Sequence, residues 1–434
     1  MPSSFTQKVE FWYPLIMVGL GLCHQVITQW AIFYYAPPPG GQVFLLVGQI
    51  GAAMVIGRIV DALSDPLIAY YSDRARSSLG RRKPFIIIGA PFFLLSFVLL
   101  WMPPVQVLSS LNFLWALTFL AIFFFSYSLI AVPYLALLPE LARGEKERVK
   151  LSAYQGIAYG VGGGLGFLAS TFLAPVMGMF RVSLYLTPLV ALTILWPAFK
   201  VENKTEGLSQ IPSPGWISQW RSVGEDRVLM MWMGIQGLCR AAVIMLVMLL
   251  PYLATVIFRI STFEDVSLAA LVIIIAGSIG SGIFFYRFLL REGVDRAYQS
   301  SLFISGIALA MLSVTGFIPW NPQIQGAILI SLVVGPIAII MLLPNAVIAG
   351  MAERRQLLKG DRQEGLLYAA QGLVIKLSIA GASALLSLCL HFGGATFQAP
   401  AGIYLSSLLA GIMLIFAFFL FLRYLALKKT SSAN

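Results

Sequence analysis

The chain has 434 residues, of which 59% are hydrophobic and only 11% are charged. A water-soluble domain cannot hide so much apolar surface behind so little charge, so the composition excludes an ordinary soluble enzyme or binding module. The net charge of +11 does not indicate a nucleic-acid partner, because Lys and Arg lie in short loops between apolar runs, where they report membrane topology.

Twelve apolar runs follow one another along the chain, and each is long enough to cross the roughly 30 Å hydrocarbon core of a bilayer as a helix. No small-residue cleavage site follows the first run, so we expect it to be retained as the first helix. The sequence therefore predicts an all-α membrane protein of about twelve transmembrane helices. The expected helices cover residues 11–36, 42–72, 84–103, 110–138, 151–177, 181–199, 227–258, 262–287, 298–318, 324–352, 365–391 and 400–427.

Basic residues are concentrated in every second loop. The loop after the second run contains five of them, whereas the alternate loops contain none apart from Arg181 and Arg259. Positive charge marks the cytoplasmic side, so we expect a multi-pass protein of the cell (inner) membrane with both termini in the cytoplasm.

The longest polar stretch, residues 200–226, divides the chain into halves of six runs each, 1–199 and 227–434. We expect this stretch to be a cytoplasmic loop between two six-helix halves. The layout is similar to that of the major facilitator fold, in which the transported solute binds between the halves.

Of the eighteen acidic residues, only Asp61 and Asp65 lie well inside an apolar run. Four residues apart, they share one helix face with Arg58 and Ser64. A carboxylate inside the membrane is costly and usually faces a cavity or pairs with a cation. Two carboxylates and a hydroxyl suit a small hard cation or a shared proton, so we predict a site for Na⁺ or H⁺. The alternative is that the two acids only neutralise Arg58 and another buried cation.

Three basic residues, Arg58, Arg240 and Lys376, also lie within apolar runs, and His24 lies in the first run. Each is a candidate for holding a solute hydroxyl or carboxylate, or for a structural ion pair. Tyr127 is a further candidate for the solute or coupling site. We expect Lys376 to approach the Asp61/Asp65 pair in at least one conformational state, as a built-in competitor of the cation. The alternative is that Lys376 binds the solute directly.

Motifs of catalysis are missing from the sequence. It contains no phosphate loop, nucleotide fingerprint, catalytic triad or metal-ligand cysteine pair. We therefore expect no enzymatic activity, no catalytic residue and no cofactor, and no metal beyond a possible Na⁺ at Asp61 and Asp65. An ion gradient is the natural source of energy. The glycine-rich run from Gly156 to Gly166 favours close helix packing over a binding site.

Three segments carry a family resemblance. "DALSDPLIAYYSDRARSSLGRRKPFIIIGAP", "VPYLALLPELARGEKERVKLSAYQG" and "GDRQEGLLYAAQGLVIKLSIAGAS" resemble segments of the glycoside–pentoside–hexuronide:cation symporters of the major facilitator superfamily. The resemblance implies a secondary active transporter for carbohydrates. We expect a symporter that couples Na⁺ or H⁺ to a sugar, glycoside or similar small organic solute, and that works as a monomer in the lipid bilayer.

The resemblance also assigns residues. It implies that Asp61, Asp65, Ser64 and Ser128 form the cation site and that Lys376 contributes to coupling. Arg81, Arg82 and Glu353 match positions of a cytoplasmic gate network. We expect the basic cluster after the second run to pair there with acids that include Asp73 and Glu140.

The chain departs from the melibiose carrier of this family at the sugar site. Ala131, Leu135 and Gly156 stand where that carrier has an aspartate, a tryptophan and an arginine, so a galactoside site is not kept. Two alternatives remain open. One is a carrier of lysolipids or other anionic amphiphiles with the same fold, and the other is a transport-inactive membrane receptor or assembly factor.

Overall fold

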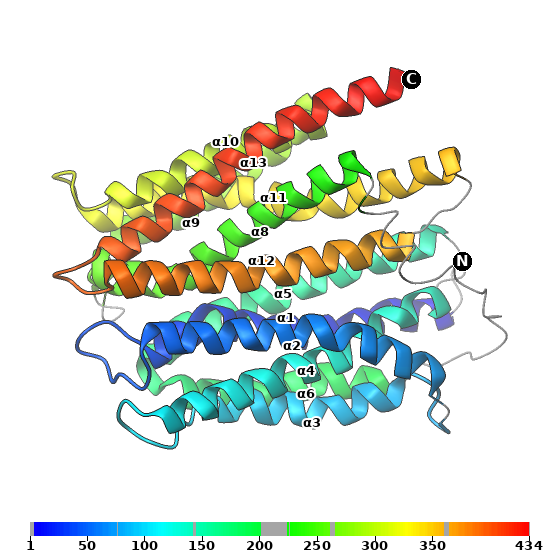
Figure 1. The fold of residues 1–434 in the computed structure, drawn as a ribbon, viewed down its shortest axis with the longest axis horizontal. Coiled ribbons are helices and arrows are strands. Elements are labelled where there is room, and N and C mark those ends of the chain that lie inside the picture. The colour runs from blue at the N-terminus through cyan, green and yellow to red at the C-terminus, as the bar shows by residue number, and fades with distance from the viewer. Residues whose placement is uncertain are drawn as a thin grey trace. The chain divides into compact units, whose positions relative to one another are not determined.

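The computed structural model describes residues 4–75, 77–141, 145–200, 224, 226–260, 265–359 and 364–433. Within these ranges the ordered structure is helical, which confirms the all-α expectation (Figure 1). The N-terminal helices are α1 (Ser4–Tyr35), α2 (Val47–Arg74), α3 (Lys83–Leu99), α4 (Ser110–Leu141), α5 (Glu145–Met177) and α6 (Met179–Lys200). The C-terminal helices are α8 (Arg227–Tyr252), α9 (Leu268–Glu292), α10 (Val294–Met311), α11 (Pro322–Lys359), α12 (Glu364–Gly393) and α13 (Ala401–Ala433).

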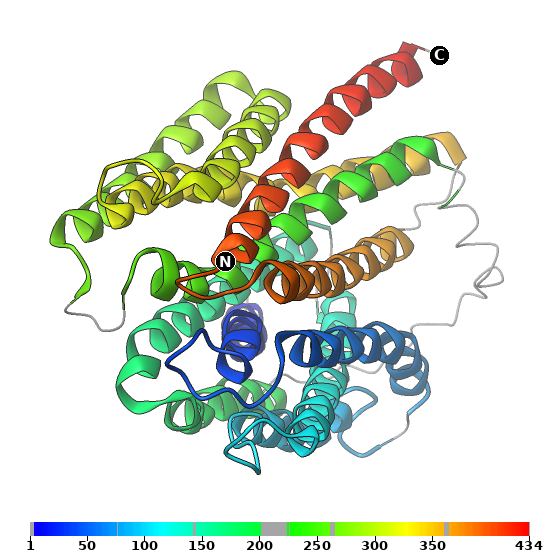
Figure 2. The same ribbon diagram turned by 60° about the vertical axis from the view of Figure 1, so that its left-hand side comes forward.

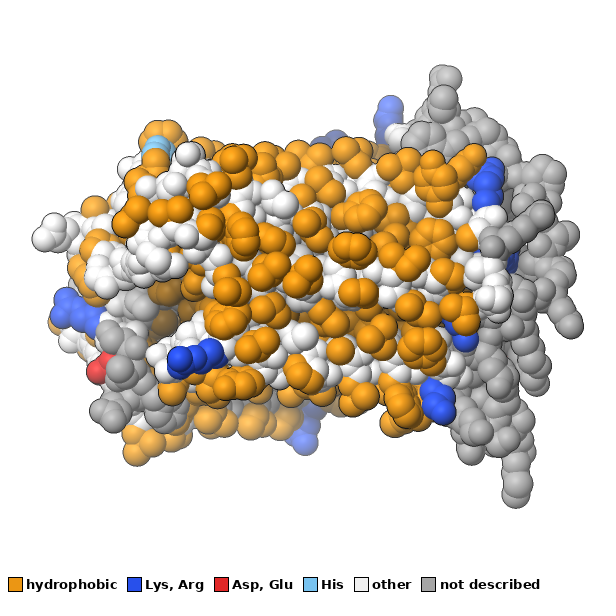
Figure 3. Space-filling model, turned by 90° about the horizontal axis from the view of Figure 1, so that it is seen from below, with side chains coloured by type: hydrophobic (Ala, Val, Ile, Leu, Met, Phe, Trp, Pro, Cys, Tyr) orange, Lys and Arg blue, Asp and Glu red, His pale blue; other side chains and the backbone are white. Residues whose placement is uncertain are grey.

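Ten of these twelve helices are long and apolar enough to cross a membrane among the described residues. The other two are α2 and α3. Charged residues in the middle of α2 lower its hydropathy, and α3 has only 17 residues. Hydrophobic side chains cover most of the molecular face shown in Figure 3, as expected for a surface that contacts lipid.

Several predicted helix limits were wrong by a few residues. The second helix begins at Val47 instead of residue 42, and the third ends at Leu99 instead of residue 103. The run predicted at 262–287 is a helix over Leu268–Glu292, and α11 continues past its apolar part to Lys359. Hydropathy marks where the chain is apolar and not where its helical hydrogen bonds begin or end, so the two limits differ by a few residues in either direction.

The chain forms two compact units, Met1–Gln210 and Ile211–Asn434, and the division falls within the stretch expected to link the halves. In the N-terminal unit, α1 packs on α5 and α6, α2 on α4, and α3 on α4 and α6. In the C-terminal unit, α8 packs on α12 and α13, α9 on α11, and α10 on α11 and α13 (Figures 1 and 2). Both units thus pair their six helices in the same pattern, as an internal repeat would.

Glycines allow the close approach of α1 and α5. A Cβ atom at Gly162 would lie 2.0 Å from the carbonyl oxygen of Val18, and one at Gly166 would lie 2.6 Å from that of Leu22. A Cβ atom at Gly160, Gly163 or Gly164 would meet nothing within 4 Å. The expected packing role therefore holds for the two glycines that face α1.

Candidate functional site

The acid pair lies in the middle of α2. The side chain of Gln49 accepts a hydrogen bond from the Leu46 N–H at 3.0 Å, which caps the start of this helix. Asp61 is almost fully buried, with 1% of its surface exposed, and Asp65, one turn later, is half-buried. The helix therefore presents both carboxylates on one face, as the sequence predicted.

A glycine lets α4 approach this part of α2. A Cβ atom at Gly57 would lie only 2.8 Å from the ring of Phe124, so the ring occupies the space that a side chain would need. Asp61 lies one turn after Gly57, and Ser128 lies one turn after Phe124. The close contact at Gly57 therefore brings Ser128 level with the acid pair.

Ser128 joins the two carboxylates. Its Oγ lies 2.8 Å from Asp61 Oδ1 and 2.6 Å from Asp65 Oδ1, and it is 1% exposed. Three oxygen atoms from two helices thus meet at one point inside the N-terminal unit. These are the hard ligands that a small cation prefers.

Ser64 is oriented differently. Its hydroxyl donates to the backbone oxygen of Asp61 at 3.0 Å. In this structure the Ser64 hydroxyl therefore forms its hydrogen bond within its own helix. Its role as a cation ligand stays a prediction, as does that of Ser128, although the Ser128 hydroxyl contacts both carboxylates.

Arg58 is held beside the acid pair without closing on it. Its Nη2 donates to Thr28 Oγ1 of α1 at 3.2 Å, and its guanidinium carbon lies 4.0 Å from the centre of the Phe124 ring. Its Nη1 is 3.8 Å from Asp61 Oδ2, an ion pair longer than a hydrogen bond. Arg58 therefore compensates part of the charge of Asp61 and leaves its Oδ1 to Ser128.

Thr28 and Phe124 were missed in the sequence. Thr28 lies four residues after His24 on the first helix, so the pattern of polar residues inside an apolar run gave a signal. Phe124 gave none, because one aromatic residue among many on α4 carries no mark of its contact with an arginine.

Two other candidates, His24 and Tyr127, lie close together on α1 and α4. The centre of the His24 ring is 5.8 Å from that of Tyr127 and 6.1 Å from that of Tyr159 on α5. His24 and Tyr127 are partly exposed. They form an aromatic cluster within the N-terminal unit, and their contact with a solute stays a prediction.

Lys376 and Arg240 belong to the C-terminal unit, on α12 and α8. A Cβ atom at Gly237 of α8 would lie 3.1 Å from Ser378 Oγ and 3.3 Å from Val374 of α12, so the two helices meet within a turn of both cations. Both side chains are half-buried. The approach of Lys376 to the Asp61/Asp65 pair stays a prediction.

The structure describes part of the expected cytoplasmic gate. Arg82 Nη2 lies 3.3 Å from Asp73 Oδ1, so one basic residue after α2 pairs with an acid at the end of that helix. Arg81, the residue before Arg82, is half-buried. The side chains of Glu140 and Glu353 lie outside the described residues.

Comparison with known proteins decides the family. A sequence profile described as MFS/sugar transport protein matches residues 13–427, which is nearly the whole chain. The chain belongs to the MFS/sugar transport family. This confirms the resemblance carried by the sequence motifs, and it agrees with the membrane-length helices of the structure.

Two relatives of this family member match parts of it. The uncharacterized symporter sll1374 of Synechocystis sp. is 31% identical over 176 residues, which are 38% of this chain and 32% of that protein. The sodium-dependent lysophosphatidylcholine symporter 1 of Gallus gallus is 32% identical over 121 residues, which are 26% of this chain and 22% of that protein. The matches therefore span less than a third of each relative's length.

The fold of this family member is also found in solved transporter structures. The crystal structure of the nucleoside transporter NupG superposes with a TM-score of 0.64 and 11% identity, over 97% of this chain and 99% of that chain. At this identity the likeness shows the fold alone. It confirms the major facilitator architecture.

Proposed function

We propose that the chain is a cation-coupled symporter whose coupling ion, Na⁺ or H⁺, binds between Asp61, Asp65 and Ser128. The contact of three oxygen atoms at 2.6 and 2.8 Å is the observation that carries this proposal.

A count of protons supports an ion site. A serine hydroxyl has one hydrogen, and an ionised carboxylate only accepts hydrogen bonds. Ser128 can therefore donate to Asp61 or to Asp65, but not to both. The remaining short oxygen–oxygen contact needs a positive charge, either a proton on one carboxylate or a cation that binds to the carboxylate oxygens beside Ser128. The cluster thus has room for one positive charge of either kind.

A count of charges leads to the same conclusion. With both carboxylates ionised, the cluster of Asp61, Asp65 and Arg58 carries one excess negative charge, which is costly inside the membrane. One monovalent cation makes it neutral. Neutralisation of the pair would favour one of the inward-open and outward-open states and so link ion binding to solute binding.

For the solute, we propose a sugar, a glycoside or a similar small organic molecule. The description of the family as sugar transport supports this choice. A second candidate is a lysolipid or another anionic amphiphile. The membrane-embedded parts of α8 and α12 contain the cations Arg240 and Lys376 and no acidic residue, which suits an anionic headgroup. A relative named as a lysophosphatidylcholine symporter supports it as well.

The proposal is tested first with the ion alone. The melting temperature of the purified protein is measured in NaCl and in choline chloride at equal ionic strength, and as a function of pH. A bound ion stabilises the folded state by about 2.7 kcal/mol at a concentration one hundred times its dissociation constant. We expect Na⁺ or a lower pH to raise the melting temperature, and Asp65→Asn to remove that response.

The matched control is Asp73→Asn, which neutralises an acid of the same helix at its exposed end and should keep the response. If neither Na⁺ nor pH acts through Asp65, the ion site is wrong, and the transport-inactive receptor becomes the better explanation. A screen of sugars, glycosides and lysolipids, with and without Na⁺, then identifies the solute. The Asp65→Asn variant should fold and insert into the membrane normally. Cells or vesicles that contain it should fail to accumulate that solute against its gradient.

A further inference from the structure

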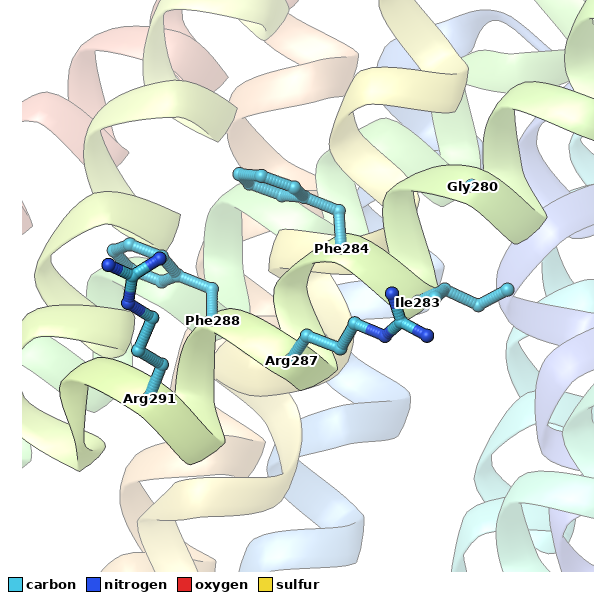
Figure 4. Close-up of a pocket in the computed structure, with 6 residues that line it drawn as sticks. All are labelled: Gly280, Ile283, Phe284, Arg287, Phe288 and Arg291. Carbon is cyan, nitrogen blue, oxygen red and sulfur yellow. The ribbon is translucent and has the colours of Figure 1, made fainter.

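The last turns of α9 form a groove on the surface of the C-terminal unit. It is lined by Gly280, Ile283, Phe284, Arg287, Phe288 and Arg291, all of which belong to α9 (Figure 4). Figure 4 shows the Arg287 side chain extending toward Ile283 and the Arg291 side chain lying beside the ring of Phe288. The groove therefore combines an apolar floor with two positive charges.

The apolar part of the groove is open to the surroundings. The exposed fractions of Ile283 and Phe284 are 52% and 60%, although both lie within the membrane-crossing helix Leu268–Glu292. Gly280 adds no side chain, and a Cβ atom there would meet nothing within 4 Å. A chain of methylene groups can therefore lie along α9 from the level of Arg287 inward.

The two arginines carry charge that nearby acids do not balance. Arg291 Nε lies 3.5 Å from Glu292 Oε1, but Glu292 also forms a closer ion pair, of 2.5 Å, with Arg296. Among the described residues, no carboxylate pairs with Arg287. Glu292 thus pairs with both Arg291 and Arg296. The positive charge of Arg287 is available to bind an anion.

The depth of the arginines fits a phospholipid. Arg287 lies five residues before the end of α9, which corresponds to about 7.5 Å along the helix axis. Arg291 lies one turn nearer the end, so both arginines belong to the last two turns of α9, where a lipid phosphate is expected. Guanidinium groups bind phosphate oxygens through paired hydrogen bonds, and basic pockets on transmembrane helices bind anionic headgroups.

We propose that this groove binds one anionic phospholipid, with its phosphate between Arg287 and Arg291 and an acyl chain along Ile283 and Phe284. In this proposal the lipid stays bound to α9 of the C-terminal unit and is distinct from the transported solute. Arginines near helix ends also extend toward the membrane surface without holding a particular lipid. Specific binding and this general behaviour of arginines differ in stoichiometry, because a specific groove is saturated by one lipid molecule.

The test is native mass spectrometry of the delipidated full-length protein, titrated with phosphatidylglycerol or with phosphatidylcholine of identical acyl chains. We expect the first phosphatidylglycerol to bind at least five times more tightly than phosphatidylcholine, about 1 kcal/mol at the tenfold-per-1.4-kcal/mol conversion. Arg287→Gln with Arg291→Gln should abolish this preference. Phe284→Ala should weaken the binding of both lipids, because it removes part of the wall that contacts the acyl chain.

The matched control is Arg227→Gln with Arg423→Gln. It removes the same amount of charge from exposed arginines of the same unit, on α8 and α13, and should keep the preference. Glycerol phosphate in excess should not displace the lipid. Equal binding of the two lipids by the parent protein, equal loss in the control pair, or displacement by glycerol phosphate would each overturn the proposal.

Discussion

Ser128 reaches the carboxylates of Asp61 and Asp65 from α4, whereas Ser64, on the same helix as the acids, bonds to its own backbone. The two serines show that residue type and spacing along one helix do not determine which acceptor a side chain contacts. A hydroxyl beside an acid in sequence has the backbone of its own helix as a competing acceptor. A hydroxyl on a packed neighbouring helix is directed at the acids by the packing itself.

We predict that Ser128→Ala weakens cation binding about tenfold, because one oxygen ligand is lost while both carboxylates remain, and that Ser128→Thr restores it. A tenfold change corresponds to about 1.4 kcal/mol. The measurement is calorimetric titration of the purified protein with Na⁺, or a pH titration of its stability if H⁺ is the coupling ion.

The control for this prediction is Ser126→Ala. Ser126 is equally buried on the same helix, but its hydroxyl donates to the backbone oxygen of Ile122 at 2.6 Å. Equal losses in the two alanine variants would show that Ser128 contributes to packing and not to the ion site.

At the scale of the helices, the site depends on the distance between α2 and α4. Gly57 faces Phe124 one turn before Asp61 and Ser128, so the two helices approach each other closely beside the acids. Phe124 also stacks against Arg58, so the same ring sets the helix spacing and holds the guanidinium. Interiors are packed too densely for an added side chain to be absorbed without movement.

We predict that Gly57→Val weakens cation binding several-fold although it removes no ligand, because the larger side chain pushes α4 and Ser128 away from α2. Overpacking of this kind also costs about 1–3 kcal/mol of stability. Gly48→Val on the same helix is the control, since a Cβ atom at Gly48 meets nothing within 4 Å. Both variants are compared by Na⁺ or pH titration. Unchanged ion affinity in Gly57→Val would contradict this account of the site.

At the scale of the whole molecule, the membrane-embedded charges are divided between the two units. Asp61, Asp65 and Arg58 belong to the N-terminal unit, and Arg240 and Lys376 belong to the C-terminal unit. A lysine in the middle of a membrane helix is costly and favours a carboxylate as its partner. This division is the basis for assigning Lys376 to coupling between the halves.

We predict that Lys376→Gln increases the affinity for the coupling ion about tenfold, because it removes a built-in cation that competes for the Asp61/Asp65 pair. Arg240→Gln, which neutralises a cation on the neighbouring helix α8, should leave the affinity unchanged. Ion affinity is measured by titration of the purified variants in the absence of solute. If Lys376→Gln loses solute binding while ion affinity stays the same, Lys376 binds the solute and does not compete with the ion.

The sequence by itself determined the class of the protein and the location of its candidate site. Apolar runs of membrane length and alternating basic loops follow from the cost of placing polar groups in hydrocarbon, which constrains every residue of a span. For the same reason the two acids of the second run could be recognised as functional candidates before their surroundings were known. Helix periodicity then placed Asp61 and Asp65 on one face.

Only the tertiary structure decided which other residues complete the site. Ser128 came with the acids by family resemblance, but its contact with both carboxylates depends on how closely α4 packs against α2 at Gly57. The link from Thr28 to Arg58 joins α1 to α2 across a sequence separation of 30 residues. Contacts of this kind depend on packing between helices, whereas hydropathy and periodicity describe one helix at a time.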